Sequence, residues 1–218
     1  MFEDRRDAGR VLATLVATLP DLHQAIALAL PRGGVPVAYE VARACNIPLD
    51  VLMVRKLGAP GQRELAIGAV ASGGIVALNS EFVVGFHISG ESLRAMIEHE
   101  QEEIARREAT YRGGALPLPI EGRTAILIDD GLATGATMRA AIHAVRPRAV
   151  QVVIAVPVAA ASTLHELESE ADRVLCLETP EDFQAVGQFY RDFSPTSDEE
   201  VRVLLADARA RMQPSPAA

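Results

Sequence analysis

Residues 125–137, with the sequence Ala-Ile-Leu-Ile-Asp-Asp-Gly-Leu-Ala-Thr-Gly-Ala-Thr, constrain the fold of this 218-residue chain more than any other segment. The four apolar residues predict a strand buried in a parallel sheet, and the pattern from Thr134 to Val145 predicts the helix that follows. Two adjacent carboxylates, Asp129 and Asp130, and a loop of small residues lie between them. Since ligands of open parallel sheets bind beyond the carboxyl ends of the strands, we expect a binding site here.

The chemistry of this segment suits a sugar phosphate. A glycine-rich loop that runs into a helix attracts an anion, because unpaired N–H groups and the helix dipole converge there. The carboxylates of Asp129 and Asp130 can accept hydrogen bonds from ribose hydroxyls beside that anion. The alternative is an ordinary strand, turn and helix with a solvated acidic end.

Strand and helix patterns alternate along the whole chain. They predict a single α/β domain over residues 1–218, with a Rossmann-like, open and mainly parallel sheet flanked by helices. Strands are expected at 24–30, 49–54, 75–78, 82–86, 125–128, 150–156 and 174–177, and helices at 11–19, 35–45, 91–111, 134–145, 160–168 and 198–211. Residues 57–74, rich in glycine, are expected to form a long mobile loop with a weak hairpin at most, 75–120 an insertion or helical subdomain, and 213–218 a disordered tail.

Residues 125–137 resemble the phosphoribosyl diphosphate (PRPP) signature of the type I phosphoribosyltransferases. The resemblance implies that family's fold, with a small variable hood. It also implies that Asp129 and Asp130 bind the ribose 2- and 3-hydroxyls. The loop that would wrap the 5-phosphate consists of Gly131, Leu132, Ala133, Thr134, Gly135, Ala136 and Thr137.

Two positions of the signature depart from the commoner family pattern. Gly131 stands where an aliphatic residue is usual. Ala133 stands where purine-using members carry an Asp that acts as base for the acceptor ring. The second departure weakens a purine-salvage interpretation, although Glu64 or a residue of the hood could substitute as the base.

Two more segments match the family's diphosphate site. Arg32, Gly33 and Gly34 follow a predicted strand where the family places its diphosphate loop, often with a non-proline cis peptide, expected here at Arg32–Gly33 or one bond earlier. In the family, a basic residue after the next strand contacts the diphosphate, and Lys56 matches it better than Arg55. The alternative for Arg55 and Lys56 is a solvated pair at a strand end. Residues 57–74 resemble the family's flexible loop, whose closure would exclude water from the reaction.

The resemblance therefore implies a Mg²⁺-dependent phosphoribosyltransferase that transfers ribose 5-phosphate from PRPP to a small nitrogenous acceptor and releases diphosphate. Lys56, Arg32 and Asp130 would be the catalytic residues. Asp129 and Asp130 would hold the metal, mostly through water and substrate. One alternative is a PRPP- or nucleotide-binding regulatory protein that keeps the fold without transferase activity. A weaker one is a hydrolase or phosphorylase that uses water or phosphate as acceptor. Retained Arg32 and Lys56 favour the enzyme, because a nucleotide binder has less need to neutralise diphosphate.

Composition excludes several other classes. The formal net charge of −8 argues against nucleic acid as a partner. Neither a GxSxG elbow nor a GxxxxGK[ST] loop occurs, and the dispersed histidines and cysteines do not have metal-ligand spacing. The N-terminus has no apolar core of the signal-peptide type, and residues 150–161 are too short to span a bilayer. We therefore expect a cytoplasmic protein with no membrane partner.

Two segments leave alternatives open. The apolar stripe of residues 91–111 is narrow, so this helix either packs on its own domain or forms a dimer contact, and we expect a homodimer. In residues 189–200, aromatic side chains beside Arg191 could stack on an acceptor ring. The other interpretation is a loop anchored on the core, with Ser197 as the N-cap of the last helix and Glu200 completing a capping box.

Overall fold

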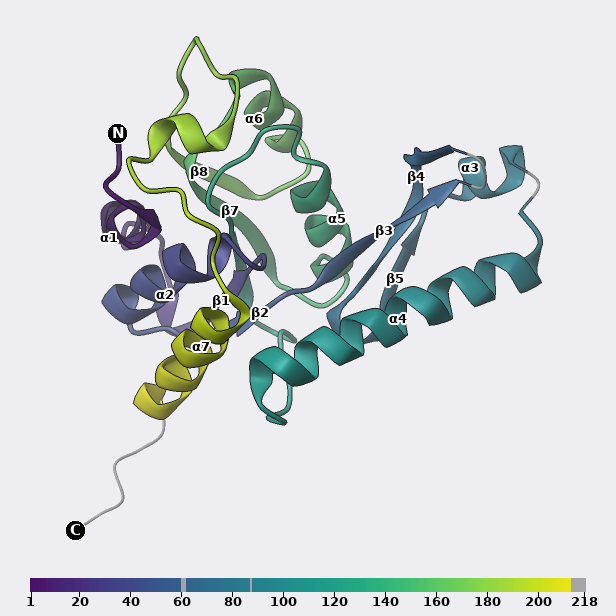
Figure 1. Ribbon diagram of the computed structural model, residues 1–218, viewed down its shortest axis with the longest axis horizontal. Helices are drawn as coiled ribbons and strands as arrows, with labels where there is room; N and C mark the ends of the chain where they lie inside the picture. Colours follow the sequence, from purple (N-terminus) through teal and green to yellow (C-terminus); the bar gives the residue numbers. More distant parts are fainter. Residues whose placement is uncertain (60–61, 87, 213–218) are drawn as a thin grey trace.

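A five-stranded parallel sheet forms the centre of the molecule in the computed structural model (Figure 1), which describes residues 1–59, 62–86 and 88–212, with 62–66, 80 and 81 described by their backbone alone. Its strands are β1 (Ala25–Ala29), β2 (Leu49–Val51), β6 (Thr124–Ile128), β7 (Gln151–Val158) and β8 (Arg173–Glu178), in the order β2-β1-β6-β7-β8. All four neighbouring pairs are parallel. The predicted Rossmann-like, mainly parallel sheet is therefore confirmed.

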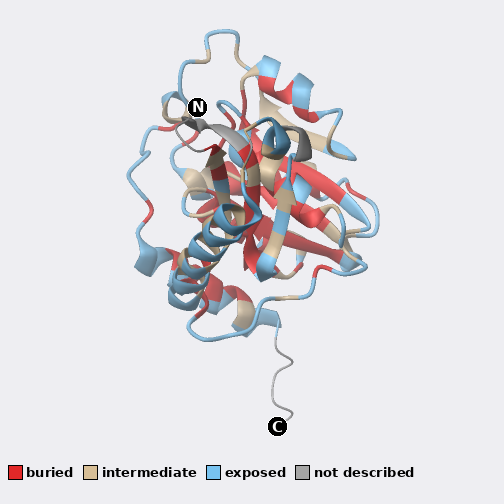
Figure 2. Cartoon of the chain, turned by 90° about the vertical axis from the view of Figure 1, so that its right-hand side faces the viewer, coloured by how far each residue is buried: buried red, intermediate tan, exposed pale blue. Residues whose placement is uncertain are grey.

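Helices cover both faces of this sheet. α1 (Arg5–Val16), α2 (Gly34–Cys45) and α7 (Asp198–Met212) pack on the face that includes Ala27 and Ile126. α5 (Ala136–Val145) and α6 (Ala161–Leu167) pack on the opposite face, which includes Leu28 and Leu127. Successive residues of a strand point to opposite faces, so strands that are apolar throughout serve both cores. Figure 2 shows this buried centre in red.

A second, antiparallel sheet extends from the central one (Figure 1). It consists of β3 (Val54–Ala59), β4 (Gln62–Ala71) and β5 (Ile75–Leu78), in that order. α3 (Ser80–Gly85) lies at its far end, and the long α4 (Gly90–Arg112) runs back along it to the central domain. The chain therefore forms a projecting arm before it enters β6. That residues 75–120 form an insertion or subdomain stays a prediction.

The prediction of a long loop at residues 57–74 was wrong, because most of this segment is β-hairpin. β3 and β4 pair from Val54 with Ala71 to Ala59 with Gln62. Gly68, which suggested a loop, lies within β4 where the backbone of β5 comes close. A Cβ at this position would lie 2.4 Å from the carbonyl oxygen of Ala77, so glycine is needed for strand pairing.

Other predicted boundaries also changed. Residues 82–85 belong to a helix and not to a strand, and Phe86 follows it in a turn, because the side chain of Asn79 accepts a hydrogen bond from the amide of Phe82 and starts α3. α5 begins at Ala136 and not at Thr134, because Gly135 has a φ of +68° and cannot be helical. β2 ends at Val51, and Val54 already belongs to the second sheet. The tail predicted at 213–218 lies outside the described residues.

α1 begins six residues earlier than expected, since Asp4 caps it by accepting from the amide of Asp7. Short 3₁₀ turns occur at Leu22–Gln24, Ser72–Gly74 and Val186–Phe189 (η1, η2 and η3). Within the described ranges, no helix has both the length and the apolar character needed to cross a membrane.

Candidate active site

Three of the predicted segments emerge from one edge of the central sheet. β2, β1 and β6 are neighbours, and Ala29 is paired with both Val51 and Ile128, so the carboxyl ends of the three strands are aligned. The diphosphate-loop segment follows β1, the basic pair lies shortly beyond β2, and the acidic signature follows β6. Strand order thus brings together segments that are up to about a hundred residues apart in sequence, at the edge where ligands of such sheets bind.

Residues 31–34 pack directly against the carboxylate pair. The non-proline cis peptide lies between Pro31 and Arg32, the second of the two expected positions. A Cβ at Gly33 would lie 2.0 Å from Oδ2 of Asp130, and one at Gly34 would lie 2.5 Å from the carbonyl oxygen of Ile128. Both glycines are therefore required for the loop to approach the end of β6 this closely.

The two carboxylates differ in their surroundings. Burial and the neighbouring charge of Asp130 raise the pKa of Asp129 well above its usual range, although its Oδ1 accepts from the backbone amide of Asp130. Burial also raises the pKa of Asp130, against the opposing effect of Arg5. Nε of Arg5 lies 2.7 Å from Oδ2 of Asp130, and both side chains are almost buried. The pair of acids therefore has one guanidinium as its counter-charge.

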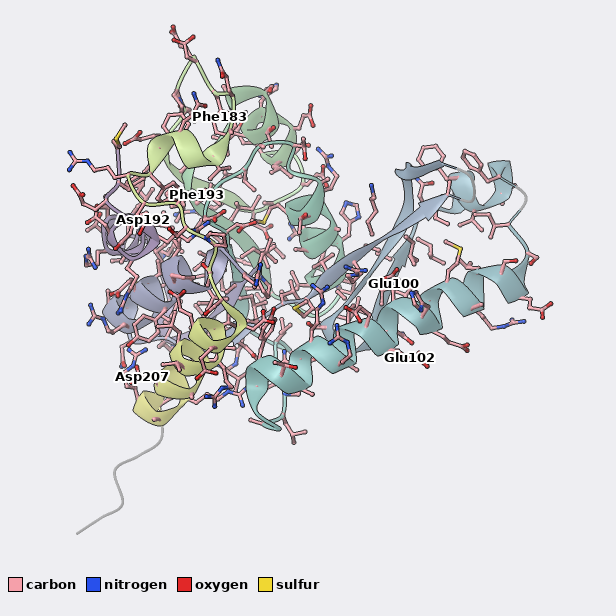
Figure 3. All side chains as sticks on the ribbon, viewed as in Figure 1. Glu100, Glu102, Phe183, Asp192, Phe193 and Asp207 are labelled. Atoms are coloured by element: carbon pink, nitrogen blue, oxygen red, sulfur yellow. The ribbon has the colours of Figure 1, made fainter. Side chains whose placement is uncertain are left out.

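The segment between β8 and α7 lies over this acidic end of β6. The hydroxyl of Tyr190 donates to the carbonyl oxygen of Asp130 at 2.6 Å. The ring of Phe193 lies under the guanidinium of Arg5, with 3.9 Å from Cζ to the ring centroid, and Arg5 also donates to the carbonyl oxygen of Ser194. Figure 3 shows Phe193 of this segment near α1 and Phe183 farther up, closer to α6, with both away from the arm.

The structure supports the anchored-loop interpretation of residues 189–200 in part. Oγ of Ser197 accepts from the amide of Glu200 at 3.1 Å, so Ser197 is the N-cap of α7 as predicted. Arg191 forms an ion pair with Glu3 on the surface. Stacking of the nearby aromatic side chains on an acceptor ring stays a prediction.

The predicted phosphate loop is held by contacts from behind. The amide of Leu132 donates to the carbonyl oxygen of Val158, and Oγ1 of Thr163 donates to that of Ala133 at 2.5 Å. Thr134, Ala136 and Thr137 are exposed. The first amides of any α-helix lack partners within the helix, so the start of α5 presents donors to an anion.

Gly131, the unusual residue of the signature, touches the C-terminal segment. A Cβ there would lie 2.6 Å from Cγ1 of Val186, in η3, and 3.0 Å from Cγ1 of Val158. Valine from a distant segment thus fills the space where a side chain at position 131 would begin.

The basic pair lies at the start of the arm. Arg55 and Lys56 belong to β3, and Nε of Arg55 lies 2.7 Å from Oε2 of Glu100, on α4. Lys56 is exposed and is the only lysine of the chain. Contact of either residue with a diphosphate stays a prediction. Arg63 and Glu64, the other residues expected in a closing loop, have side chains outside the described residues.

The acidic pair suits a divalent cation that also has substrate ligands. Among the described residues, two largely buried carboxylates face the guanidinium of Arg5, and a divalent cation with oxygen ligands would add positive charge beside them. Within the part of the chain that the structure describes, no group of three or more His, Cys, Asp or Glu side chains could hold a metal. Asp129 and Asp130 could supply only part of a ligand set, which is compatible with Mg²⁺ because this ion prefers oxygen ligands and usually keeps several waters.

Sequence reasoning missed Arg5, and it missed a group of charged residues around Arg32. A polar cleft of about 270 Å³ is lined by Arg32, Arg106, Arg107, Thr110, Tyr111 and Asp198. Arg5, Arg107 and Asp198 come from three different helices and belong to no local motif. Only the fold brings them to the candidate site.

Comparisons with known proteins show which family the chain belongs to. The family model of the phosphoribosyl transferase domain matches residues 6–194. A Mycobacterium tuberculosis protein, curated under two strains and named provisionally as a phosphoribosyl transferase, is 46% identical over 206 residues, which cover 94% of this chain and 46% of the relative. The chain thus spans about half the length of these curated relatives. The crystal structure of a Thermus thermophilus protein is 41% identical, covers 94% of this chain and 98% of that one, and has a TM-score of 0.84.

Proposed function

Because the chain belongs to the phosphoribosyl transferase domain family, we propose that it transfers ribose 5-phosphate from PRPP to a small nitrogenous acceptor with release of diphosphate. One observation carries the proposal: the loop after β1, the basic start of β3 and the signature after β6 lie at the aligned carboxyl ends of three adjacent strands. A donor with a phosphate at one end and a diphosphate at the other needs two anion sites on either side of a sugar site. The order of these segments along the edge of the sheet supports such an arrangement.

Each part of the donor has a candidate partner. Asp129 and Asp130 would accept from the ribose hydroxyls. The loop from Gly131 to Thr137 would bind the 5-phosphate through its amides and hydroxyls. Arg32, with the loop that contains Gly33 and Gly34, and the basic pair on β3 would neutralise the diphosphate.

Displacement of diphosphate from C1 of the ribose passes through a transition state with positive charge on the sugar. Catalysis therefore depends on positioning the two reactants and stabilising the leaving group, with little covalent work for the protein. Arg32 and Lys56 would stabilise the negative charge that grows on the diphosphate. Asp130 would hold the sugar in place and lower the energy of its cationic state. Mg²⁺ bound at Asp129 and Asp130 would supply further neutralisation of the diphosphate oxygens.

The acceptor must supply its own nucleophilic nitrogen or find a base outside the signature, since residue 133 is alanine. This favours an acceptor that does not depend on a carboxylate of the phosphate loop. Tyr190 contacts the backbone of Asp130, and Phe193 packs on Arg5, so an acceptor ring could pack against this aromatic segment.

The test is release of diphosphate from PRPP in the presence of Mg²⁺ and a panel of nitrogenous bases and related amines. We expect at least one acceptor to accelerate release well above the rate with water. Tight binding of PRPP without release for any acceptor would contradict the transferase and favour a regulatory PRPP-binding protein. A rate that is full with water alone would instead indicate a hydrolase.

A further inference from the structure

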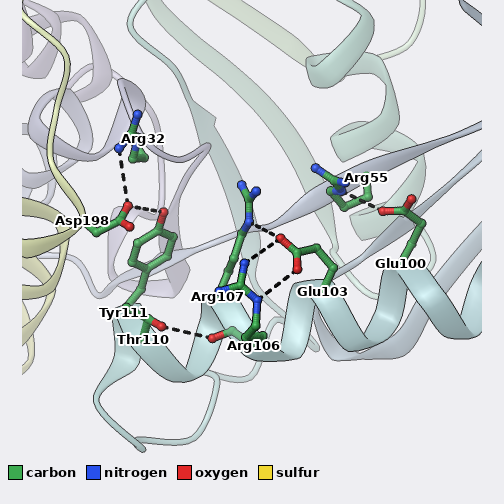
Figure 4. A network of polar contacts seen from close by, with 9 residues as sticks. All are labelled: Arg32, Arg55, Glu100, Glu103, Arg106, Arg107, Thr110, Tyr111 and Asp198. Atoms are coloured by element: carbon green, nitrogen blue, oxygen red, sulfur yellow. Dashed lines mark hydrogen bonds and ion pairs between the residues drawn. The ribbon is translucent and has the colours of Figure 1, made fainter.

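The polar cleft beside Arg32 contains three guanidinium groups and one carboxylate. Arg32 comes from the loop after β1, Arg106 and Arg107 come from α4, and Asp198 is the first residue of α7 (Figure 4). Cations from separate elements that face one cleft form an anion site if their charges are not fully compensated. The question is therefore what already compensates them.

Glu103 neutralises one of the two arginines of α4 more completely than the other. It accepts from Nε and Nη2 of Arg106 at 3.0 and 2.9 Å, and from Nε of Arg107 at 2.7 Å. In Figure 4 the guanidinium of Arg107 extends beyond Glu103, away from α4. Arg107 therefore presents the far end of its guanidinium to the cleft, whereas Arg106 is clasped against its own helix.

Asp198 lies where an anionic ligand would be expected. Its Oδ1 is 3.6 Å from Nη1 of Arg32 and accepts from the hydroxyl of Tyr111 at 2.9 Å. The pKa of the Tyr111 phenol is raised, first by burial and then by the hydrogen bond to Asp198, while Arg107 and Arg32 act in the opposite direction. Arg107 and Arg32 thus act on the hydroxyl that binds Asp198, and Arg106 lies within electrostatic range of Asp198 itself.

The position of Asp198 is not explained by helix capping. Ser197 already caps α7 through its hydroxyl, so the side chain of Asp198 is available to turn toward Tyr111 and Arg32. It is more than half exposed, so an incoming anion can compete with it for the same partners.

The cleft adjoins the proposed sugar site. Arg32 directly precedes Gly33, and the backbone of Gly33 packs so closely on the carboxylate of Asp130 that an added Cβ would clash with it. An anion held between Arg32 and Arg107 would therefore be attached to, or lie next to, a group bound at Asp130. In the proposed donor, that anion is the diphosphate.

We propose that Arg107 of α4 completes the diphosphate site with Arg32, and that Asp198 occupies the anion position in the ligand-free protein and leaves Arg32 when diphosphate binds. This inference rests on the proposed function, whose leaving-group site it extends. It makes α4 and α7 part of the site, so that donor binding is coupled to the start of the C-terminal helix. No bond is made or broken in this exchange, because one anion replaces another at the same cations.

Two variants should change the affinity for inorganic diphosphate in opposite directions. Asp198→Asn keeps an oxygen that can accept from Tyr111 but removes the competing charge, so the dissociation constant should fall roughly three- to fivefold, as expected for a partly exposed charge. Arg107→Gln removes a charge-assisted donor, so the constant should rise roughly tenfold. Isothermal titration calorimetry of the full chain with sodium diphosphate and Mg²⁺ measures both.

Two control variants make the same changes in charge at residues that do not line the cleft. Glu199→Gln alters the next residue of α7, whose carboxylate pairs with Arg202 on the surface. Arg94→Gln removes an exposed arginine from the distant end of α4. Neither should change the affinity for diphosphate by more than about twofold, because Glu199 is exposed and paired with Arg202 outside the cleft, and Arg94 lies at the far end of α4.

The inference is overturned if Asp198→Asn and Glu199→Gln bind diphosphate equally, or if Arg107→Gln binds as tightly as the wild type while its circular dichroism is unchanged. Turnover is measured separately with PRPP and the acceptor panel. Opposite shifts in affinity with no turnover would uphold the cleft and contradict the proposed transferase. Turnover with no difference between Asp198→Asn and Glu199→Gln would uphold the transferase and contradict the cleft.

Discussion

Nε of Arg5, in the first turn of the N-terminal helix, donates to Oδ2 of Asp130 at the end of β6 over a distance of 2.7 Å. The two residues are 125 positions apart in sequence. Arg5 lies just outside the part of the chain that the family model matches, whereas Asp130 belongs to the signature. A residue outside the matched domain thus supplies the counter-charge of a candidate substrate-binding carboxylate.

Replacing Arg5 should destabilise the ligand-free protein strongly. Both side chains are nearly buried, and Arg5→Ala would leave the Asp129–Asp130 pair without its guanidinium. Loss of one partner of a buried ion pair costs on the order of 3 kcal/mol. Urea denaturation at neutral pH should show a decrease of this size in the free energy of unfolding.

The control for Arg5 is an arginine of the same helix. Arg10 forms an exposed ion pair with Asp7, so Arg10→Ala should cost less than about 1 kcal/mol. Equal losses for the two variants would show that Arg5 contributes no more than a surface charge.

Gly131 and Val186 should be energetically coupled. Gly131→Ala places a methyl group 2.6 Å from Cγ1 of Val186, and such overpacking typically costs about 1–3 kcal/mol. Adding Val186→Ala removes the two shortest contacts and leaves the one with Val158 at 3.0 Å, so the double variant should be destabilised by about 1 kcal/mol less than the sum of the two single effects. Thermal or urea unfolding of the four proteins of this cycle gives the coupling energy.

A second glycine-to-alanine variant serves as the control, because it shows the effect of alanine on stability where no contact is created. A Cβ at Gly85 meets nothing within 4 Å, so Gly85→Ala should not be destabilising. If the effects of Gly131→Ala and Val186→Ala on stability are strictly additive, Val186 does not occupy the space in which a side chain at position 131 would lie.

Lys56 can be tested chemically because it is the only lysine of the chain. If it contacts the diphosphate, PRPP with Mg²⁺ should slow its modification by an amine-reactive reagent, as measured by peptide mass spectrometry. The α-amino group of Met1, which lies beside Glu178, is the internal control and should react at the same rate throughout. Lys56→Ala should lower turnover roughly 10²–10³-fold, as for other preorganised charge contacts. Equal labelling of Lys56 with and without PRPP would contradict its assignment to the diphosphate site.

Asp172 should make stability depend on acidic pH. Burial tends to raise the pKa of this carboxyl, but the hydrogen bond from the amide of Val152 and the interaction with Arg146 outweigh burial and lower it. A depressed folded-state pKa stabilises the protein above the unfolded value near 3.9, and this contribution is lost as the pH falls through the folded value. Urea midpoints of the wild type should therefore fall more steeply below pH 4 than those of Asp172→Asn.

Asp182→Asn provides the comparison for that pH series, since Asp182 is an exposed carboxylate in the turn after β8. It should follow the wild type at every pH. Parallel curves for the wild type and Asp172→Asn would show that the Val152 and Arg146 contacts do not lower the pKa of Asp172.

The parallel sheet and the location of the signature were predictable because their signals are local. Apolar runs long enough for buried strands alternate with helical patterns, and Asp129 and Asp130 directly follow one such run. The general rule on the carboxyl ends of parallel strands then places the loops together. Residues 57–74 were mispredicted because several glycines and Pro60 give this segment the composition of a loop, whereas Gly68 serves close strand pairing.

The electrostatic partners of the site were not predictable from the sequence. Arg5, Arg107 and Asp198 lie on surface-like stretches of amphipathic helices, where a charged residue ordinarily faces water. Their roles depend on where α1 and α7 begin, and where α4 ends, relative to β1 and β6. Gly131 could be recognised as unusual, but its explanation in Val186 requires the contact itself.

Titration of PRPP into the wild type and Asp130→Asn, with Mg²⁺ and with diphosphate release followed in parallel, tests the central claim most directly. We predict Mg²⁺-dependent binding of PRPP to the wild type and, with an active acceptor, release of diphosphate. Asp130→Asn should retain its circular dichroism but lose release roughly 10²–10³-fold. Binding and turnover equal to the wild type in a folded Asp130→Asn would contradict the assignment of this edge of the sheet as the PRPP site.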